Sequence, residues 1–279
     1  MSSSFLTPKW IYSARGADRP SFSPDGSKVV FHVQSGDDVS LWIVDADGGD
    51  PHRIYPPGGN ANPRASRPDW SWSDRIAFGN AGAIWTINPD GSGAAPYYRG
   101  TVAPPDGLTY PSWYKDLGAI VAVAYGERSG VRSATLYKLT PQAIEQLTKS
   151  PNPCAGRPSV NPEGTKIAFA GNSLVCSQSV NQIWVKEPNI RPHMIEPGDP
   201  AHVQGRSPNW SPLGDLIVFS SNRGKPPTES LAIWVMNSDG TNPRRITEIG
   251  LHPQWNRQQT KIVLASPSGK IGIVNFRGM

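Results

Sequence analysis

The chain has 279 residues and combines 28 glycines, 29 prolines and ten tryptophans with a net charge of +5. Glycine and proline are unfavourable inside helices, so their number excludes a helical bundle, and the many tryptophans exclude a disordered chain. The basic residues are scattered and no apolar run reaches the roughly 18 residues of a membrane span, so we expect no nucleic-acid partner and no membrane span.

The first residues, MSSSFLTPKW, show no basic start followed by an apolar stretch. We therefore expect no signal peptide and a cytoplasmic location for the chain as written. A periplasmic or secreted location applies if the chain is a processed form, so the compartment stays open. The phrase PKWIY from Pro8 matches PHRIY from Pro51, which predicts a strand of the same kind ahead of the first repeat.

One phrase recurs six times: a proline, usually an aromatic residue two positions later, a turn and an apolar triplet. The copies lie 43 to 50 residues apart and begin at Pro20, Pro68, Pro111, Pro158, Pro208 and Pro253. Five copies keep the same distance from the proline to the end of the triplet, and the second copy is one turn residue shorter. This register predicts a repeat architecture.

Each copy predicts a small antiparallel sheet. In the first copy, PSFSPDGSKVVF, Asp25-Gly26 predicts a tight turn between two strands, since this dipeptide tolerates positive φ. A third strand is expected at residues 41–44, and a fourth, weaker strand begins at Pro51. Four antiparallel strands in about 45 residues describe one blade of a β-propeller.

The sixth copy has no fourth strand of its own, because only four residues follow residues 271–275. We expect the strand at Pro8 to complete this last blade, since an open ring leaves two blade faces uncovered. The sequence thus predicts an all-β fold: a single six-bladed β-propeller domain over residues 1–279, closed by its N-terminal strand. We expect this domain to be a monomer.

The recurring aromatic residues are predicted to form the core between blades rather than sugar-stacking platforms. In the first strands they are Phe22, Trp70, Trp113, Trp210 and Trp255, with Val160 as the exception. In the third strands they are Trp42, Trp85, Tyr137, Trp184 and Trp234. Tyr97-Tyr98 and Trp72 are the alternative candidates for an exposed sugar platform, but we favour packing roles for them as well.

Two long phrases resemble the TolB-type propeller repeat, with its Trp-Ser-Pro-Asp-Gly core and terminal Asp-Gly turn. They are SFSPDGSKVVFHVQSGDDVSLWIVDADGGDPHRI from Ser21 and NWSPLGDLIVFSSNRGKPPTESLAIWVMNSDGTNPRRIT from Asn209. The resemblance covers essentially the whole chain and implies a six-bladed propeller. The family includes protein-docking propellers, lids of serine peptidases and carbohydrate-active enzymes, so it leaves the function open.

The residue before each repeat proline is expected at the entrance of an innermost strand, on the face that carries the longer loops. These positions and one neighbour bring four arginines, a tyrosine and a histidine to the predicted channel mouth: Arg19, Arg67, Tyr110, Arg157, Arg206 and His252. Converging guanidinium groups favour an anion such as carboxylate or phosphate. The alternative is that each arginine pairs locally with an acid such as Asp18, Asp69, Glu196 or Asp199.

Our first hypothesis is a non-enzymatic module that binds a protein segment or a small anionic ligand at this mouth. The alternatives are a carbohydrate-active or isomerising enzyme, using His202, His252, Tyr110 and an arginine as acid–base groups, and a sugar-binding lectin with repeated pockets. We expect no cofactor and no metal, since no phosphate-binding glycine loop and no metal-ligand spacing of histidines occurs. Cys154 and Cys176 are compatible with a loop disulfide or with two separate thiols.

Overall fold

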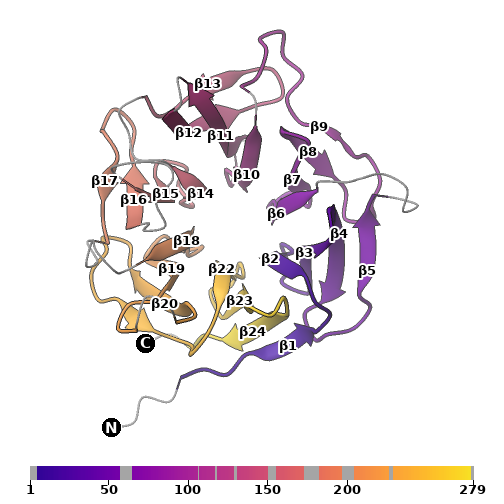
Figure 1. Ribbon diagram of the computed structural model, residues 1–279, viewed down its shortest axis with the longest axis vertical. Coiled ribbons are helices and arrows are strands. Elements are labelled where there is room, and N and C mark those ends of the chain that lie inside the picture. The colour runs from indigo at the N-terminus through magenta and orange to yellow at the C-terminus, as the bar shows by residue number, and fades with distance from the viewer. Residues whose placement is uncertain are drawn as a thin grey trace.

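The computed structural model describes residues 5–56, 65–105, 107–116, 118–128, 131–149, 155–172, 182–196, 204–225 and 229–277. Their strands form six four-stranded antiparallel sheets arranged around a central axis (Figure 1). The predicted six-bladed β-propeller is therefore confirmed. Among these residues, no helix is long and apolar enough to cross a membrane.

The strands of the first three blades follow one another along the chain. Blade 1 consists of β2 (Ala17–Phe22), β3 (Lys28–Ser35), β4 (Asp38–Asp45) and β5 (His52–Tyr55). Blade 2 consists of β6 (Ser66–Trp70), β7 (Ile76–Asn80), β8 (Ala83–Ile87) and β9 (Ala95–Pro96). Blade 3 consists of β10 (Leu108–Trp113), β11 (Ile120–Arg128), β12 (Val131–Leu139) and β13 (Ile144–Gln146).

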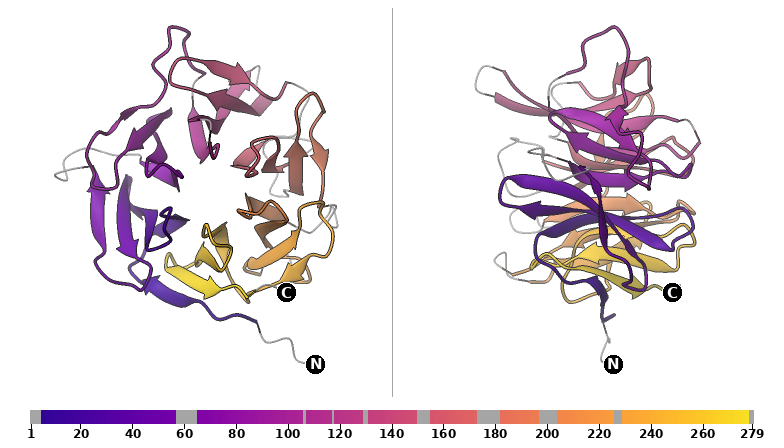
Figure 2. Two further views of the ribbon diagram at one scale, coloured as in Figure 1. Left: turned by 180° about the vertical axis from the view of Figure 1, so that it is seen from behind. Right: turned by 90° about the vertical axis from the view of Figure 1, so that its right-hand side faces the viewer.

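The last blade differs from the others in taking a strand from the other end of the chain. Blade 4 consists of β14 (Gly156–Val160), β15 (Ile167–Gly171), β16 (Gln182–Lys186) and β17 (His193–Met194). Blade 5 consists of β18 (Gly205–Trp210), β19 (Leu216–Ser221), β20 (Ala232–Asn237) and β21 (Arg244–Arg245). Blade 6 consists of β22 (Leu251–Trp255), β23 (Lys261–Ala265), β24 (Ile271–Asn275) and β1 (Lys9–Tyr12). The first strand of each repeat lies innermost, and turns and loops project from both faces of the ring (Figures 1 and 2).

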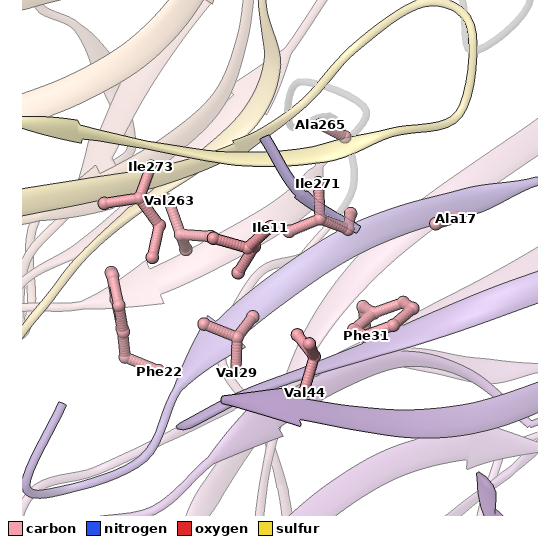
Figure 3. Close-up of a cluster of buried hydrophobic side chains, with 10 residues drawn as sticks. All are labelled: Ile11, Ala17, Phe22, Val29, Phe31, Val44, Val263, Ala265, Ile271 and Ile273. Atoms are coloured by element: carbon pink, nitrogen blue, oxygen red, sulfur yellow. The ribbon is translucent and has the colours of Figure 1, made fainter. Parts of the chain in front are cut away.

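The N-terminal strand closes the ring as predicted. β1 pairs antiparallel with β24, with Lys9 opposite Ile273. Ile11 is 5% exposed and lies in the apolar cluster between blades 6 and 1 (Figure 3). Blade 6 contributes Ile271 and Ile273 to this cluster, and blade 1 contributes Phe22 among others. The strand from one end of the sequence thus joins the core built by the other end.

The first-strand aromatic residues pack in the core as predicted, but the third-strand ones do not reach full burial. Four of the first-strand aromatics are buried, and Trp113 and Val160 pack at the edges of their clusters. The third-strand aromatics are partly buried and pack against the edges of the apolar clusters: Trp42, Trp85, Tyr137, Trp184 and Trp234. The reason is that second-strand phenylalanines fill the interior instead; they are fully buried and comprise Phe31, Phe78, Phe169 and Phe219.

Every first strand contains a β-bulge at the repeat proline. In blade 1, Asp18 pairs with His32 and Ser21 pairs with Val30, so Arg19 and Pro20 together oppose the single residue Phe31. The same shift occurs in the other five blades. The residue before each proline has a φ between 49° and 58°, a region that non-glycine residues rarely occupy. The bulge therefore turns six equivalent side chains in the same way.

The residue after each repeat proline links its blade to the next one. Its side-chain oxygen accepts a hydrogen bond from a backbone N–H of the next blade. The donor is the residue two positions after the repeat proline of that next blade. The donor–acceptor pairs are Trp70–Ser21, Trp113–Asp69, Val160–Ser112, Trp210–Ser159, Trp255–Asn209 and Phe22–Gln254, at 2.8–3.4 Å. The six bonds form a closed circle, which we call the inter-blade ring.

Glycines in the outer turns permit close packing of neighbouring blades. Gly91 has a φ of +84°, and a Cβ atom there would lie 2.8 Å from the carbonyl oxygen of Ile54 in blade 1. Gly240 has a φ of +90°, and a Cβ atom there would clash with the carbonyl oxygen of Ile195 in blade 4. Both contacts explain why the third strand ends in an Asp-Gly turn in these blades.

Removing one acceptor of the inter-blade ring is expected to destabilise the fold. Ser159 is 3% exposed, and its hydroxyl accepts hydrogen bonds from the Trp210 backbone N–H and from Asn209 Nδ2. Ser159→Ala leaves these buried donors without a partner and should lower the free energy of unfolding by about 1–3 kcal/mol. Denaturant unfolding measures this loss. The matched control is Ser35→Ala on an exposed position of β3, and an equal effect in both variants contradicts the role of the ring.

Candidate functional site

The bulges bring the predicted mouth residues together at one end of the central channel. A cavity of about 90 Å³ is lined there by Arg19, Arg67, Tyr110, Arg157 and His252, and by Ser207 of blade 5. Five of the six predicted residues therefore share one cavity. Arg206 does not line it, but its charge is close enough to interact with those of Arg157 and Tyr110.

Tyr110 is the centre of the arginine cluster. The guanidinium carbons of Arg67, Arg19 and Arg157 lie 4.2, 4.9 and 6.0 Å from the centroid of its ring. Tyr125 packs against the same ring at 6.2 Å between centroids. Cations favour the face of an aromatic ring, so Tyr110 allows three like charges to gather in a small space.

The same charges alter the titration of the phenol. Burial alone would raise the pKa of Tyr110, but the positive charges of Arg19, Arg157 and Arg67 and a hydrogen bond from Arg157 lower it to about 7. Burial lowers the pKa of Arg19 to about 10, with the charges of Arg157 and Arg67 acting in the same direction. A tyrosine that ionises near neutral pH is unusual, since the ordinary value is about 10.

A histidine–carboxylate pair lies beside this cluster. His252 Nδ1 is 2.5 Å from Asp18 Oδ1, although the two residues are 234 positions apart in the sequence. Burial, helped by the charge of Arg19, lowers the pKa of His252 to about 3, so this ring is neutral and donates its Nδ1–H to the carboxylate. Burial alone would raise the pKa of Asp18, but interactions with His252 and Arg19 hold it below its usual range.

Within the described residues, the acids proposed as local partners do not form ion pairs with Arg67 or Arg157. Asp18 lies 3.7 Å from Arg19 Nε, but Glu196 pairs with Arg223 at 2.8 Å. Asp69 accepts from the Trp113 backbone and from Gln254 Nε2. Asp199 lies outside the described residues. The expectation of a local acid is therefore met for Arg19, whereas no described carboxylate forms an ion pair with Arg67 or Arg157.

The floor of the cavity is formed by polar residues that the sequence analysis did not place there. They belong to the inter-blade ring and comprise Asp69, Ser112, Asn209 and Gln254. A signal for them was present, because the residue after every repeat proline is polar, in contrast to the apolar strands around it. Burial raises the pKa of Asp69, which lies within hydrogen-bonding distance of its neighbours on this floor.

Other candidates do not join the mouth. Tyr97 is buried against Trp113, and Tyr98 donates a hydrogen bond to the carbonyl of Val102, so neither forms a free sugar platform with Trp72. His202, Cys154 and Cys176 lie outside the described residues. Within the residues that are described, no group of three or more histidine, cysteine, aspartate or glutamate side chains is arranged to hold a metal ion.

Comparison with solved structures supports the fold. A TolB candidate from Agrobacterium tumefaciens has a TM-score of 0.69 and 16% identity over 99% of this chain and 100% of its own. A gluconolactonase from Xanthomonas campestris has a TM-score of 0.72 and 11% identity over 96% and 89%. An oligogalacturonate lyase from Vibrio parahaemolyticus has a TM-score of 0.61 and 10% identity over 99% and 95%.

At these identities the similarity concerns the fold alone, and the functions of the three proteins differ. No family profile matches the sequence. No curated protein sequence matches it either.

The titration of Tyr110 is directly measurable. Because its folded pKa is about 7 and its unfolded pKa is about 10, we expect one tyrosine to ionise near pH 7 in the native protein. Ultraviolet difference absorbance of tyrosinate should show this step, and Tyr110→Phe should remove it. The depressed pKa also stabilises the fold increasingly as the pH rises from 7 to 10, relative to Tyr110→Phe. A native protein with no tyrosine ionising below pH 9 contradicts the cluster.

Proposed function

We propose that this chain is a TolB-like, single-domain propeller that acts as a binding module for an anionic group. The group is a carboxylate or phosphate, carried by a small ligand or by an acidic protein segment, and it binds at the channel mouth. One observation carries the proposal: Arg19, Arg67 and Arg157 line a single cavity, and Asp18 is the one described carboxylate that forms an ion pair with any of these three arginines.

Two physical arguments support an anion site: the crowded positive charges of the arginines, and hydrogen-bond donors that have no partner in the described part of the chain. Crowding guanidinium groups in a partly desolvated cavity is costly, and an anion between them offsets their repulsion. Arginine also binds carboxylate and phosphate through two parallel hydrogen bonds, which gives specificity as well as affinity. Among the described residues, Arg67 Nε and the buried Ser207 hydroxyl have no hydrogen-bond partner, so each keeps an unused donor.

Removal of two arginines should weaken anion binding. We expect Arg67→Ala combined with Arg157→Ala to weaken the binding of citrate and of an oligoglutamate peptide by at least about thirtyfold, since the loss of buried charge partners costs about 2–5 kcal/mol. Isothermal titration calorimetry measures both affinities. Citrate and the peptide also separate a small-ligand site from a site for a protein segment.

The matched control removes the same charge elsewhere. Arg53→Ala combined with Arg244→Ala changes two exposed arginines of the outer strands β5 and β21 and should leave both affinities nearly unchanged. If the wild-type protein binds neither probe, or if the control pair weakens binding as much as the mouth pair, the proposed anion site is wrong.

A second candidate is a carbohydrate-active enzyme that uses Tyr110 as a proton acceptor. The pKa of about 7 favours this role, because a general base works best when its pKa is near the working pH. We rank it second because Tyr110 is then the single described acid–base group of the mouth that changes charge near neutral pH. His252 is neutral and is hydrogen-bonded to Asp18.

Turnover separates the two candidates. Oligogalacturonate and gluconolactone are suitable first substrates, since the lyase and the lactonase share the fold. The enzyme hypothesis predicts product formation that falls as the pH drops below 7, where Tyr110 becomes protonated, and that disappears in Tyr110→Phe. Anion binding without any product formation supports the binding module instead.

A further inference from the structure

At one position of the repeat, three blades carry a residue other than proline, and these three side chains lie close together. Four residues after the repeat proline, blades 1, 4 and 5 carry the proline of the Trp-Ser-Pro-Asp-Gly core, at Pro24, Pro162 and Pro212. Blades 2, 3 and 6 carry Trp72, Lys115 and Arg257 instead. This position lies in the first turn of each blade, at the end of the innermost strand away from the mouth.

The three departing side chains meet although their blades are not all neighbours. β2 lies between β22 and β6, so Arg257 of blade 6 must reach past blade 1 to contact blade 2 (Figure 1). It donates a hydrogen bond of 2.7 Å to the Trp70 carbonyl, and its guanidinium carbon lies 3.8 Å from the Trp72 ring centroid. Lys115 Nζ lies 4.8 Å from the same ring centroid.

These residues line a pocket at the end of the channel opposite to the mouth. The pocket has a volume of about 80 Å³, and its floor includes Asp69, Ser112, Asn209 and Gln254, which also form the floor of the mouth cavity. The inter-blade ring therefore separates two cavities on one axis. Pro162 and Pro212 form an apolar part of the wall, whereas Trp72, Lys115 and Arg257 form a cationic and aromatic part.

Neither cation, Lys115 nor Arg257, forms an ion pair with an acid of the described residues, although the charge of Asp69 attracts Arg257. The nearby Asp69 uses its two oxygens for the Trp113 N–H and Gln254 Nε2. Burial lowers the pKa of Arg257 to about 10, and the charge of Asp69 offsets only part of this effect, so the guanidinium remains destabilised. An anion near both cations would offset this cost.

The chemistry of the walls defines the ligand. Two cations on one tryptophan ring recognise a negative group, and the prolines and the ring offer apolar surface for a flat body beside it. The small volume limits the occupant to a compact molecule. We propose that this pocket is a second binding site, independent of the mouth, for a small organic acid that joins a carboxylate to an apolar ring or chain.

Benzoate is a suitable probe, and the indole N–H resonance of Trp72 is a suitable reporter. With isotope-labelled tryptophan, the Trp72 resonance is identified by its absence in Trp72→Phe. We expect benzoate to shift this resonance to saturation. Neutral benzamide lacks the charge and inorganic phosphate lacks the apolar body, so each should bind at least about tenfold more weakly than benzoate.

Variants locate the site and separate it from the mouth. Lys115 is exposed, so Lys115→Gln should fold normally and weaken benzoate binding about tenfold or more, with a larger loss when Arg257→Gln is added. The mouth pair Arg67→Ala with Arg157→Ala should leave the Trp72 titration unchanged. A Trp72 resonance that does not respond to benzoate, an equal response to benzamide, or an unchanged affinity in Lys115→Gln overturns the proposal.

Discussion

The inter-blade ring is the constraint on which the rest of this propeller depends. Each of its acceptors lies one residue after a repeat proline, and each donor is a backbone N–H of the next blade, so every blade fixes the height of its neighbour along the channel. The circle closes only where Gln254 of blade 6 accepts from the N–H of Phe22 in blade 1, at 3.2 Å. The propeller is therefore closed at two places where its last and first blades meet: by β1 at the outer rim and by Gln254 at the channel.

The ring also explains how the mouth can hold so much positive charge. The residue that precedes each repeat proline has a positive φ, which costs of the order of 1 kcal/mol or more for a non-glycine residue. The proline and the ring residue, which follow it in the chain, hold this conformation in place. Arg19, Arg67 and Arg157 are thus presented on fixed backbone, and the face of Tyr110 separates them. A rigid scaffold of this kind is what a preorganised binding site requires.

The fold could be predicted because the proline, the turn and the apolar triplet keep their register in six copies, and the mouth residues could be predicted because they share one repeat position. The conformation of that position could not, since a residue before proline is ordinarily extended. The pairing of His252 with Asp18 was hidden because it joins blades 6 and 1, which are adjacent only after closure. The meeting of Trp72 with Arg257 was hidden for a similar reason: it spans a whole blade.

The bulge before the repeat proline has an implication for how such a protein changes over time. Its backbone shape is the same whether the residue is arginine, tyrosine, serine or histidine, as in Arg67, Tyr110, Ser207 and His252. Side-chain identity is thereby uncoupled from scaffold geometry. A substitution at one of these six positions can therefore change the side chain at the rim, and with it the ligand selectivity, while the sheets beneath it stay as they are.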